Sequence, residues 1–221
     1  MSINVPYQGP AQMPDALPLF PLAGALLLPR AELPLNIFEP RYLAMVDDAL
    51  RTRRLIGMIQ PDARSGEAPA PALYGIGCVG RITQFAETGD GRYLMTLSGV
   101  ARFRNVEELT VLTPYRQCRA DFREFVADFS AREGEDQVDR AGVLSALRDY
   151  ASANELEVDW KSVEAAPNEA LVNALSMMSP FGPQEKQALL EARTLKLRAE
   201  TLIAITEMEL AHAAGAPTSI Q

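Results

Sequence analysis

Residues 17–50 read LPLFPLAGALLLPRAELPLNIFEPRYLAMVDDAL, and this stretch decides the fold because it places prolines at positions 18, 21, 29, 34 and 40. Proline lacks a backbone N–H and restricts the residue before it, so the segment ahead of Pro40 favours short extended pieces over helix. The spacing predicts two short strands, at 17–20 and 33–38. Pro40 suits the first turn of a helix, which we expect to run to about residue 52 with one apolar face formed by Tyr42, Leu43, Val46 and Leu50.

The sequence that follows, up to residue 130, is typical of β structure. It is rich in β-branched and aromatic residues and is interrupted by glycine-containing turn signals. We therefore expect a β-rich subdomain with one helix over residues 16–130. Its later strands are expected at 55–60, from Tyr74 onward and at 115–126, with a surface loop at 61–71, a turn at 89–91 and a bend at Gly99.

A change of pattern after residue 130 predicts a second, helical subdomain. REGEDQ, at 132–137, is polar, and the apolar residues beyond it recur with the period of a helix. We expect a helical bundle over 136–212. Residues 1–15 carry no periodic pattern and are expected to form a mobile tail, and residues 213–221 a disordered one. The predicted fold class is α+β.

Composition narrows the possible functions. The 221 residues carry a net charge of -8 and a pI near 4.8, which argues against a nucleic-acid partner because phosphate contacts need a clustered basic surface. No stretch approaches the length of apolar chain needed to cross a bilayer, so we expect no membrane insertion. The only cysteines, Cys78 and Cys118, lie in strand-like apolar runs, which favours buried reduced thiols and a cytoplasmic protein.

Motifs that would carry catalysis are weak or missing. Gly75, Gly77 and Gly80 spell G-x-G-x-x-G, but a dinucleotide site needs a helix after this turn and here the strand pattern continues, so close packing of a curved strand is the better interpretation. The single histidine, His212, is expected at a solvated helix end, and no P-loop segment is present. We predict no catalytic, cofactor-binding or metal-binding residues, and no cofactor.

Two groups of residues in the first stretch are candidate interaction or structural sites. Glu39, Pro40, Arg41 and Tyr42 form a dense strand-to-helix junction, which we expect to be structural, with Glu39 and Arg41 pinning the corner while Phe38 and Tyr42 pack beneath it. The leucines nearby exceed what one face of a narrow strand can bury, so part of the segment is a candidate protein-binding patch, although core packing is the favoured use. The patch comprises Leu26, Leu27, Leu28, Leu33, Leu35 and Phe38.

Four segments together carry a family resemblance. Residues 17–50, LYGIGCVGRITQF at 73–85, LSGVARFRN at 97–105 and PFGPQEKQALLEARTLKLRAETLI at 180–203 resemble, in order, the amino-terminal substrate-binding domain of the Lon protease family, especially its stand-alone bacterial versions. The resemblance covers about residues 13–212. It implies a curled, β-rich, PUA-like pseudobarrel followed by a carboxyl-terminal helical bundle.

The resemblance also implies a function that involves no catalysis. In full-length Lon this region engages unfolded or tagged proteins and helps to organise the oligomer, while ATP hydrolysis and the Ser-Lys dyad reside in later domains that we expect this chain not to reach. We therefore expect a non-catalytic recognition module or adaptor, with unfolded or tagged protein segments, or a separate protease, as partners. The alternatives are an assembly protein that self-associates or docks on a protease, and an enzyme with a small-molecule pocket in the barrel.

Overall fold

The proline-rich stretch folds as its prolines predict. In the computed structural model, which describes residues 5–62 and 70–215, β1 (Ala16–Pro21) and β2 (Glu32–Ile37) are short strands, and α1 (Pro40–Arg51) begins at its proline. The backbone N–H groups of Tyr42 and Leu43 both donate to the carbonyl oxygen of Glu39, at 2.9 Å. Pro40 has no N–H that would need an acceptor, and no side chain caps the start of the helix.

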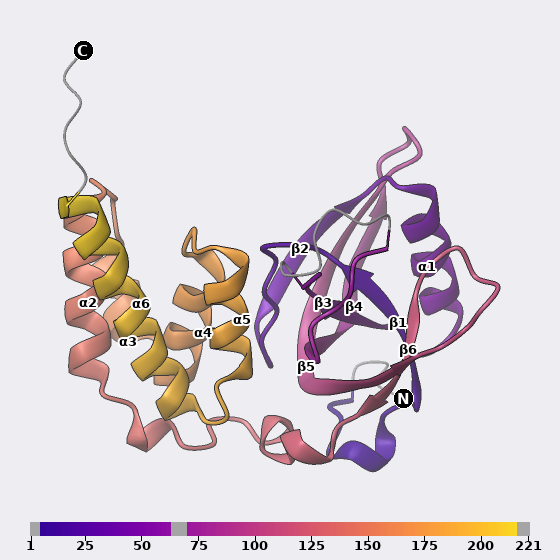
Figure 1. Ribbon diagram of the computed structural model, residues 1–221, viewed down its shortest axis with the longest axis horizontal. Coiled ribbons are helices and arrows are strands. Elements are labelled where there is room, and N and C mark those ends of the chain that lie inside the picture. The colour runs from indigo at the N-terminus through magenta and orange to yellow at the C-terminus, as the bar shows by residue number, and fades with distance from the viewer. Residues whose placement is uncertain (1–4, 63–69, 216–221) are drawn as a thin grey trace.

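A six-stranded sheet curls into a barrel (Figure 1). The later strands are β3 (Leu55–Ile59), β4 (Ile76–Glu87), β5 (Tyr93–Glu108) and β6 (Gln117–Asp121). Their order is β2-β5-β4-β3-β1-β6, and β6 also pairs with β5, which closes the ring. Only the β1–β3 pairing is parallel among the described strands. β2 lies outside the ring and pairs with the first half of β5 alone.

Two glycines allow the barrel to close tightly. A Cβ on Gly77 would lie 2.6 Å from the Phe103 ring, and a Cβ on Gly99 would lie 2.0 Å from the carbonyl oxygen of Leu28. The β4–β5 register shifts between Val79 and Gly80, where β5 bends at Gly99. β4 begins at Ile76, directly after Gly75, and continues as strand through Gly77, Gly80 and beyond. A Cβ on Gly80 would lie 2.8 Å from Leu27, so the prediction of close packing is confirmed for Gly77 and Gly80, as is the bend at Gly99.

The barrel interior is apolar. Leu17, Leu19 and Phe103 are fully buried there, and Cys118 is a free buried thiol beside them. A second and larger cluster lies between the sheet, α1 and the helical subdomain; it includes Leu27, Met45, Leu97 and Leu189, and buries Cys78. Both cysteines are reduced and buried, as predicted.

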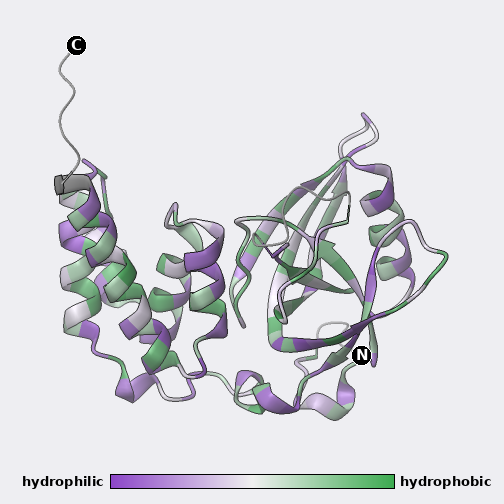
Figure 2. Cartoon of the chain, viewed as in Figure 1, coloured by the Kyte–Doolittle hydropathy of each residue, from purple (hydrophilic) through white to green (hydrophobic). Residues whose placement is uncertain are grey.

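Five α-helices follow the barrel. Figure 2 shows hydrophobic segments on the strands and hydrophobic residues alternating with hydrophilic ones along the helices, as expected where each helix buries one side. Short 3-10 helices, η3 (Arg123–Phe129) and η4 (Glu135–Gln137), link the two parts. The helices are α2 (Arg140–Ala153), α3 (Trp160–Ala165), α4 (Asn168–Met178), α5 (Pro183–Glu191) and α6 (Leu195–Gly215).

The structure differs from the predicted boundaries in two places. Residues 5–15 pack against the barrel instead of forming a free tail: they include the 3-10 helix η1 (Pro10–Gln12), Met13 is 7% exposed, and the Arg81 guanidinium lies 4.3 Å from the centre of the Tyr7 ring. The last strand ends at Asp121, and the residues up to Phe129 form η3 because the chain turns there toward the helices. Residues 1–4, 63–69 and 216–221, which include parts of the predicted tails and loop, lie outside the described residues.

Candidate functional site

Three strands present an outward face that no other described element of the chain covers. Cross-strand partners point to the same side of a sheet, and the register pairs Thr96 with both Pro34 and Gln84, and Leu94 with both Asn36 and Ala86. Met95, which alternates with these β5 residues, is 3% exposed and points to the core. We call the six outward residues, Pro34, Asn36, Gln84, Ala86, Leu94 and Thr96, the β2–β5–β4 face.

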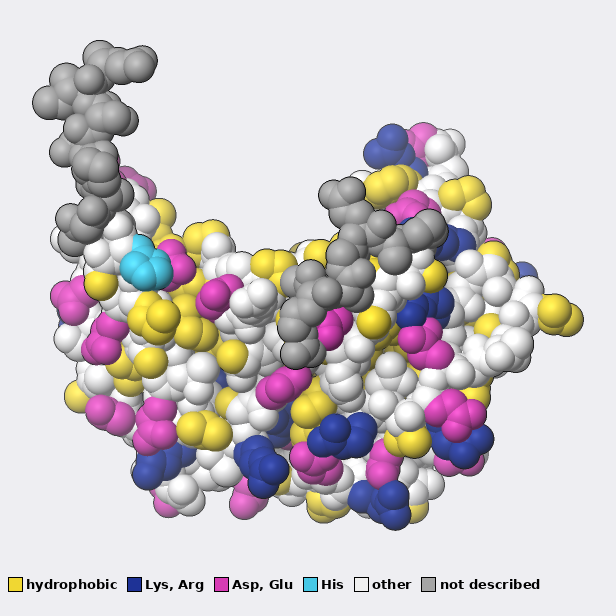
Figure 3. Space-filling model, viewed as in Figure 1, with side chains coloured by type: hydrophobic (Ala, Val, Ile, Leu, Met, Phe, Trp, Pro, Cys, Tyr) yellow, Lys and Arg dark blue, Asp and Glu magenta, His cyan; other side chains and the backbone are white. Residues whose placement is uncertain are grey.

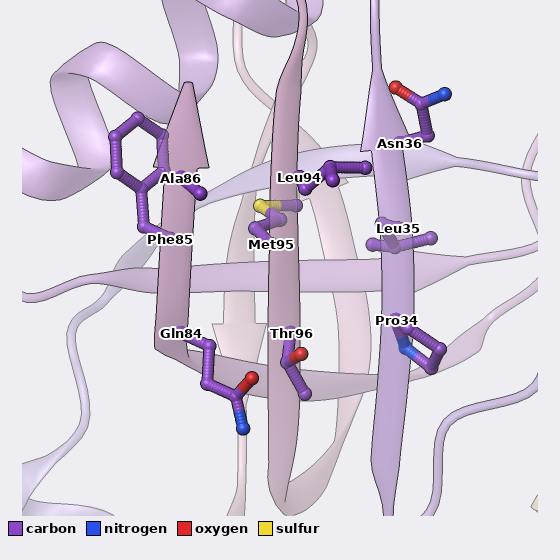
Figure 4. Close-up of a pocket in the computed structure, with 9 residues that line it drawn as sticks. All are labelled: Pro34, Leu35, Asn36, Gln84, Phe85, Ala86, Leu94, Met95 and Thr96. Carbon is purple, nitrogen blue, oxygen red and sulfur yellow. The ribbon is translucent and has the colours of Figure 1, made fainter. Parts of the chain in front are cut away.

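This face is hollowed and uncharged. A shallow depression of about 550 Å³ lies across the three strands (Figure 4). None of its lining residues carries a charge, although 23% of the chain is charged. Leu94 is the largest apolar side chain on the outward side and is 48% exposed. The lining consists of the six residues of the β2–β5–β4 face with Leu35, Phe85 and Met95.

Aromatic side chains also lie at the end of the β4–β5 hairpin, where Phe85 is on the core side of the strands because its register partner is Met95. Phe38 is 61% exposed, and the Arg92 guanidinium lies 5.9 Å from its ring centre. Phe85 contacts Tyr93 edge to face at 4.9 Å, and the Tyr93 hydroxyl donates to Asp47 of α1 at 3.0 Å. Donating this bond to the Asp47 carboxylate raises the pKa of Tyr93. Figure 3 shows hydrophobic side chains at the surface near this end of the barrel. The hairpin is therefore tied to α1 while its apolar side chains stay open.

The predicted leucine patch is wrong for its first three members. Leu26, Leu27 and Leu28 are at most 2% exposed and belong to the core cluster. The connection between β1 and β2 passes under the sheet, where the carbonyl oxygen of Leu28 lies against Gly99, so these side chains point inward. Leu33 and Leu35 are half-buried against the same cluster. Of the six residues, only Phe38 is widely exposed.

Three residues of the strand-to-helix junction, Glu39, Arg41 and Tyr42, make contacts that hold the corner. The Arg41 Nε donates to Glu39 at 2.9 Å, and the Tyr42 ring packs 4.3 Å from the ring of Phe20. Burial raises the pKa of Tyr42. Phe38 does not pack beneath the corner as predicted, because β2 ends at Ile37 and leaves the next side chain outside.

A polar cluster at the barrel–helix boundary was not predicted. Arg102 of β5 is 3% exposed and donates from Nη2 to Asp128 of η3 at 2.8 Å. The same guanidinium donates to the carbonyl oxygens of Leu190 and Ala192, which end α5. One buried side chain thus joins the barrel, its linker and the helices. In the sequence it sits between Ala101 and Phe103, and no local signal distinguishes it from an exposed arginine on a strand.

A second buried arginine lies beside it. Arg198 of α6 is 4% exposed and donates to the carbonyl oxygen of Leu189 and to Asn173, both at 3.0 Å. Asn173 in turn donates to the carbonyl oxygen of Pro29. Burial, together with the charge of Arg102, lowers the pKa of Arg198 to about 10.

Among residues 5–62 and 70–215, no cluster of three or more His, Cys, Asp or Glu side chains could hold a metal ion. Within the same ranges, no helix is both long and apolar enough to cross a membrane. His212 is exposed on α6. Burial raises the pKa of both thiols, that of Cys118 to about 12, so neither is poised as a nucleophile.

A family model supplies the decisive comparison. The model of the ATP-dependent protease La (LON) substrate-binding domain matches residues 16–207. The chain belongs to this family. The match spans both the barrel and the helices, so the Lon substrate-binding domain comprises both parts of the structure.

Individual relatives agree with this assignment. Lon protease 2 of Sorangium cellulosum is 28% identical over 209 residues, covering 91% of this chain, and Lon protease 2 of Myxococcus xanthus is 34% identical over 110 residues, covering 49%. The chain spans 26% of the length of the first relative and 13% of the second.

Solved structures show the same fold. The Lon N-terminal domain protein from Xanthomonas campestris aligns with a TM-score of 0.61 at 24% identity, covering 86% of this chain and 97% of that one. The N-terminal domain of the Mycobacterium avium complex Lon protease gives the same TM-score at 15% identity, covering 87% and 98%. The α+β class and the Lon-type resemblance predicted from the sequence are confirmed.

Proposed function

We propose that this Lon-type domain is a non-catalytic recognition module that binds extended, apolar segments of other proteins on the β2–β5–β4 face. The observation that carries the proposal is the uncharged hollow of about 550 Å³, with Leu94 half-exposed on it and the exposed Phe38 two residues beyond Asn36. An open apolar surface in a chain with a net charge of -8 is a candidate protein-binding site.

The shape of the surface suits an extended segment. Side chains on a strand alternate, so a segment lying across three strands places every second apolar residue against the hollow. Unfolded or tagged proteins offer such segments. The family supports a protein-recognition role, and the proposed setting is the bacterial cytoplasm, which the two buried reduced cysteines support.

The direct test is a titration of the chain against a fluorescent, permanently unfolded polypeptide, with anisotropy and a cleavage gel read together, with and without ATP. We expect saturable binding, an intact polypeptide and no effect of ATP. Leu94→Asp should weaken binding about tenfold, because it removes roughly half of a leucine's burial and adds a charge to the contact.

Val106→Asp is the matched control. Val106 lies on the same strand and is 52% exposed, but it is far from the hollow in the register of β5. Equal loss of binding in both variants, or no binding by the unaltered chain, would rule out recognition on this face. The same face could instead mediate assembly. In that case the apparent molecular mass of the unaltered chain in solution would rise with its concentration, Leu94→Asp would abolish the rise, and the unfolded polypeptide would not bind.

A further inference from the structure

The boundary between barrel and helices encloses a charged cavity of about 200 Å³. Five cationic side chains and three carboxylates line it, which leaves an excess of two positive charges. This is unusual in a chain whose net charge is -8. The cations are Arg30, Arg102, Arg193, Lys196 and Arg198, and the carboxylates are Asp128, Glu133 and Glu169.

Lys196 lies 3.9 Å from Glu200, which does not line the cavity, whereas two other cations are paired with carboxylates of the lining. Arg102 is paired with Asp128, both nearly buried, and Arg30 is paired with Glu169, which its Nε contacts at 3.0 Å. These pairs form two walls of the cavity. Because they satisfy each other, they leave the remaining cations to account for the excess charge.

Arg198 forms no ion pair with any described residue, although it is only 4% exposed. Its Nε and Nη1 donate to a backbone carbonyl and to a neutral amide, and its Nη2 donates to no described residue. A buried cation without a counter-charge is costly. The lowered pKa of this guanidinium, caused first by burial and then by Arg102, reflects that cost.

The start of α6 faces the same cavity. Thr194, Leu195 and Lys196 line it, and the Thr194 hydroxyl caps the N–H of Leu197 at 3.1 Å. No described acceptor is bonded to the backbone N–H groups of Leu195 and Lys196. α6 is 21 residues long, and Figure 1 shows it starting at the end of the molecule where the chain passes from barrel to helices. Free N–H groups at the start of a long helix favour an anion.

We infer that this cavity binds a phosphate group, either free phosphate or a small phosphate monoester. A phosphate carries about two negative charges at neutral pH, which matches the excess of two in the cavity. Its oxygens would accept from Nη2 of Arg198, from the free N–H groups that start α6, and from the side chains of Arg193 and Lys196, which line the opening. The bound group would bridge the helices to the linker beside Asp128.

The test is calorimetric titration of the full chain with inorganic phosphate, against sodium chloride at equal ionic strength, with thermal unfolding measured in parallel. We expect saturable binding of one phosphate and a rise in the melting temperature with phosphate concentration. O-phosphoserine and serine then separate the two sources. Tighter binding of O-phosphoserine than of phosphate indicates a monoester, and equal or weaker binding indicates free phosphate.

Arg193→Gln with Lys196→Gln is the first variant, because both side chains are exposed and the fold does not depend on them. The dissociation constant should rise about tenfold or more, since charge-assisted hydrogen bonds are lost. Arg119→Gln with Arg123→Gln is the matched control: it removes the same charge from exposed arginines, 59% and 85% accessible, on and beside β6. Arg198→Met should abolish binding.

The proposal fails if phosphate and chloride act alike on the unaltered chain. It also fails if the exposed double variant binds as tightly as the control. The second criterion holds even if Arg198→Met does not fold.

Discussion

The interior of the barrel and its boundary with the helices are built in opposite ways. Leu17, Leu19 and Phe103 fill the barrel without a charged neighbour in their cluster. Arg102 lies next to Phe103 on β5 and is also buried, but its guanidinium donates to Asp128 and to the carbonyl oxygens of Leu190 and Ala192 at the end of α5. Apolar packing is tolerant of direction, whereas a guanidinium bonds only where acceptors stand at fixed angles. Packing therefore holds the barrel closed, and directional bonds orient the helices against it.

The largest effect is expected at the boundary. Arg102→Met leaves Asp128 buried without its partner, and we expect the free energy of unfolding to fall by about 3–5 kcal/mol. Trp160 of α3 is the only tryptophan, so its fluorescence reports the helices, and circular dichroism of the sheet reports the barrel. In urea, the helices should unfold at a lower concentration than the barrel. Coincident transitions at the unaltered midpoint would contradict the comparison.

Arg102→Met with Asp128→Leu sharpens the same test. Removing both charges relieves the buried carboxylate, so the double variant should recover part of the stability lost in the single one. The orientation of the helices should not recover, because the bonds to the α5–α6 connection stay broken.

A smaller loss is expected in the apolar core. Leu27→Ala deletes a side chain that is 1% exposed, and we expect a cost of about 2–4 kcal/mol with a single cooperative transition in urea. Phe38→Ala, at a side chain 61% exposed, should leave the unfolding midpoint unchanged and weaken binding of the unfolded polypeptide. If Leu27→Ala weakened binding without lowering stability, and Phe38→Ala lowered stability without weakening binding, Leu27 would belong to the binding patch after all.

Alkaline pH should weaken the fold gradually. Burial raises the pKa of Cys118 to about 12 and that of Cys78 well above its usual range. A raised folded-state pKa contributes stability below the unfolded value of about 8.5, and the contribution is lost as pH rises above it. Urea midpoints should therefore fall between about pH 8.5 and 12, and Cys78→Ala with Cys118→Ala should flatten the decline. An unchanged slope in the double variant would assign the decline to other groups.

The smallest effect is expected at the strand-to-helix corner. Arg41 and Glu39 are 51% and 42% exposed, so solvent screens their pair, and Arg41→Ala should cost less than about 1 kcal/mol in urea unfolding. A loss comparable to that of Leu27→Ala would mean that the corner, and not the core beneath it, fixes α1.

Much of the fold follows from local signals in the sequence. Prolines at 18, 34 and 40 mark β1, β2 and the first turn of α1, because proline restricts the backbone wherever it stands. The glycine at 99 marks the bend of β5 for a similar reason. The order of the strands is not local, and the sequence contains no sign that β5 pairs with β2, β4 and β6.

The candidate sites were harder to predict. Leu26–Leu28 and Phe38 look alike as apolar residues near prolines, and only the path of the chain under the sheet separates buried from exposed. No sequence signal marks Leu94 as exposed, because the alternation of a strand does not indicate which of its sides is covered. The arginines of the boundary, Arg102 of β5 and Arg198 of α6, line the same cavity although they are far apart in the chain.

β5 pairs with three other strands, and this limits where members of the family can vary in length. One residue inserted into β5 would shift its register against several neighbours at once, turning core side chains to solvent on each. The connection between β5 and β6 is different: Leu112 is fully exposed there, at 106%. Length changes, tags and fused segments should therefore accumulate in that connection, while β5 keeps a fixed number of residues among relatives that differ everywhere else.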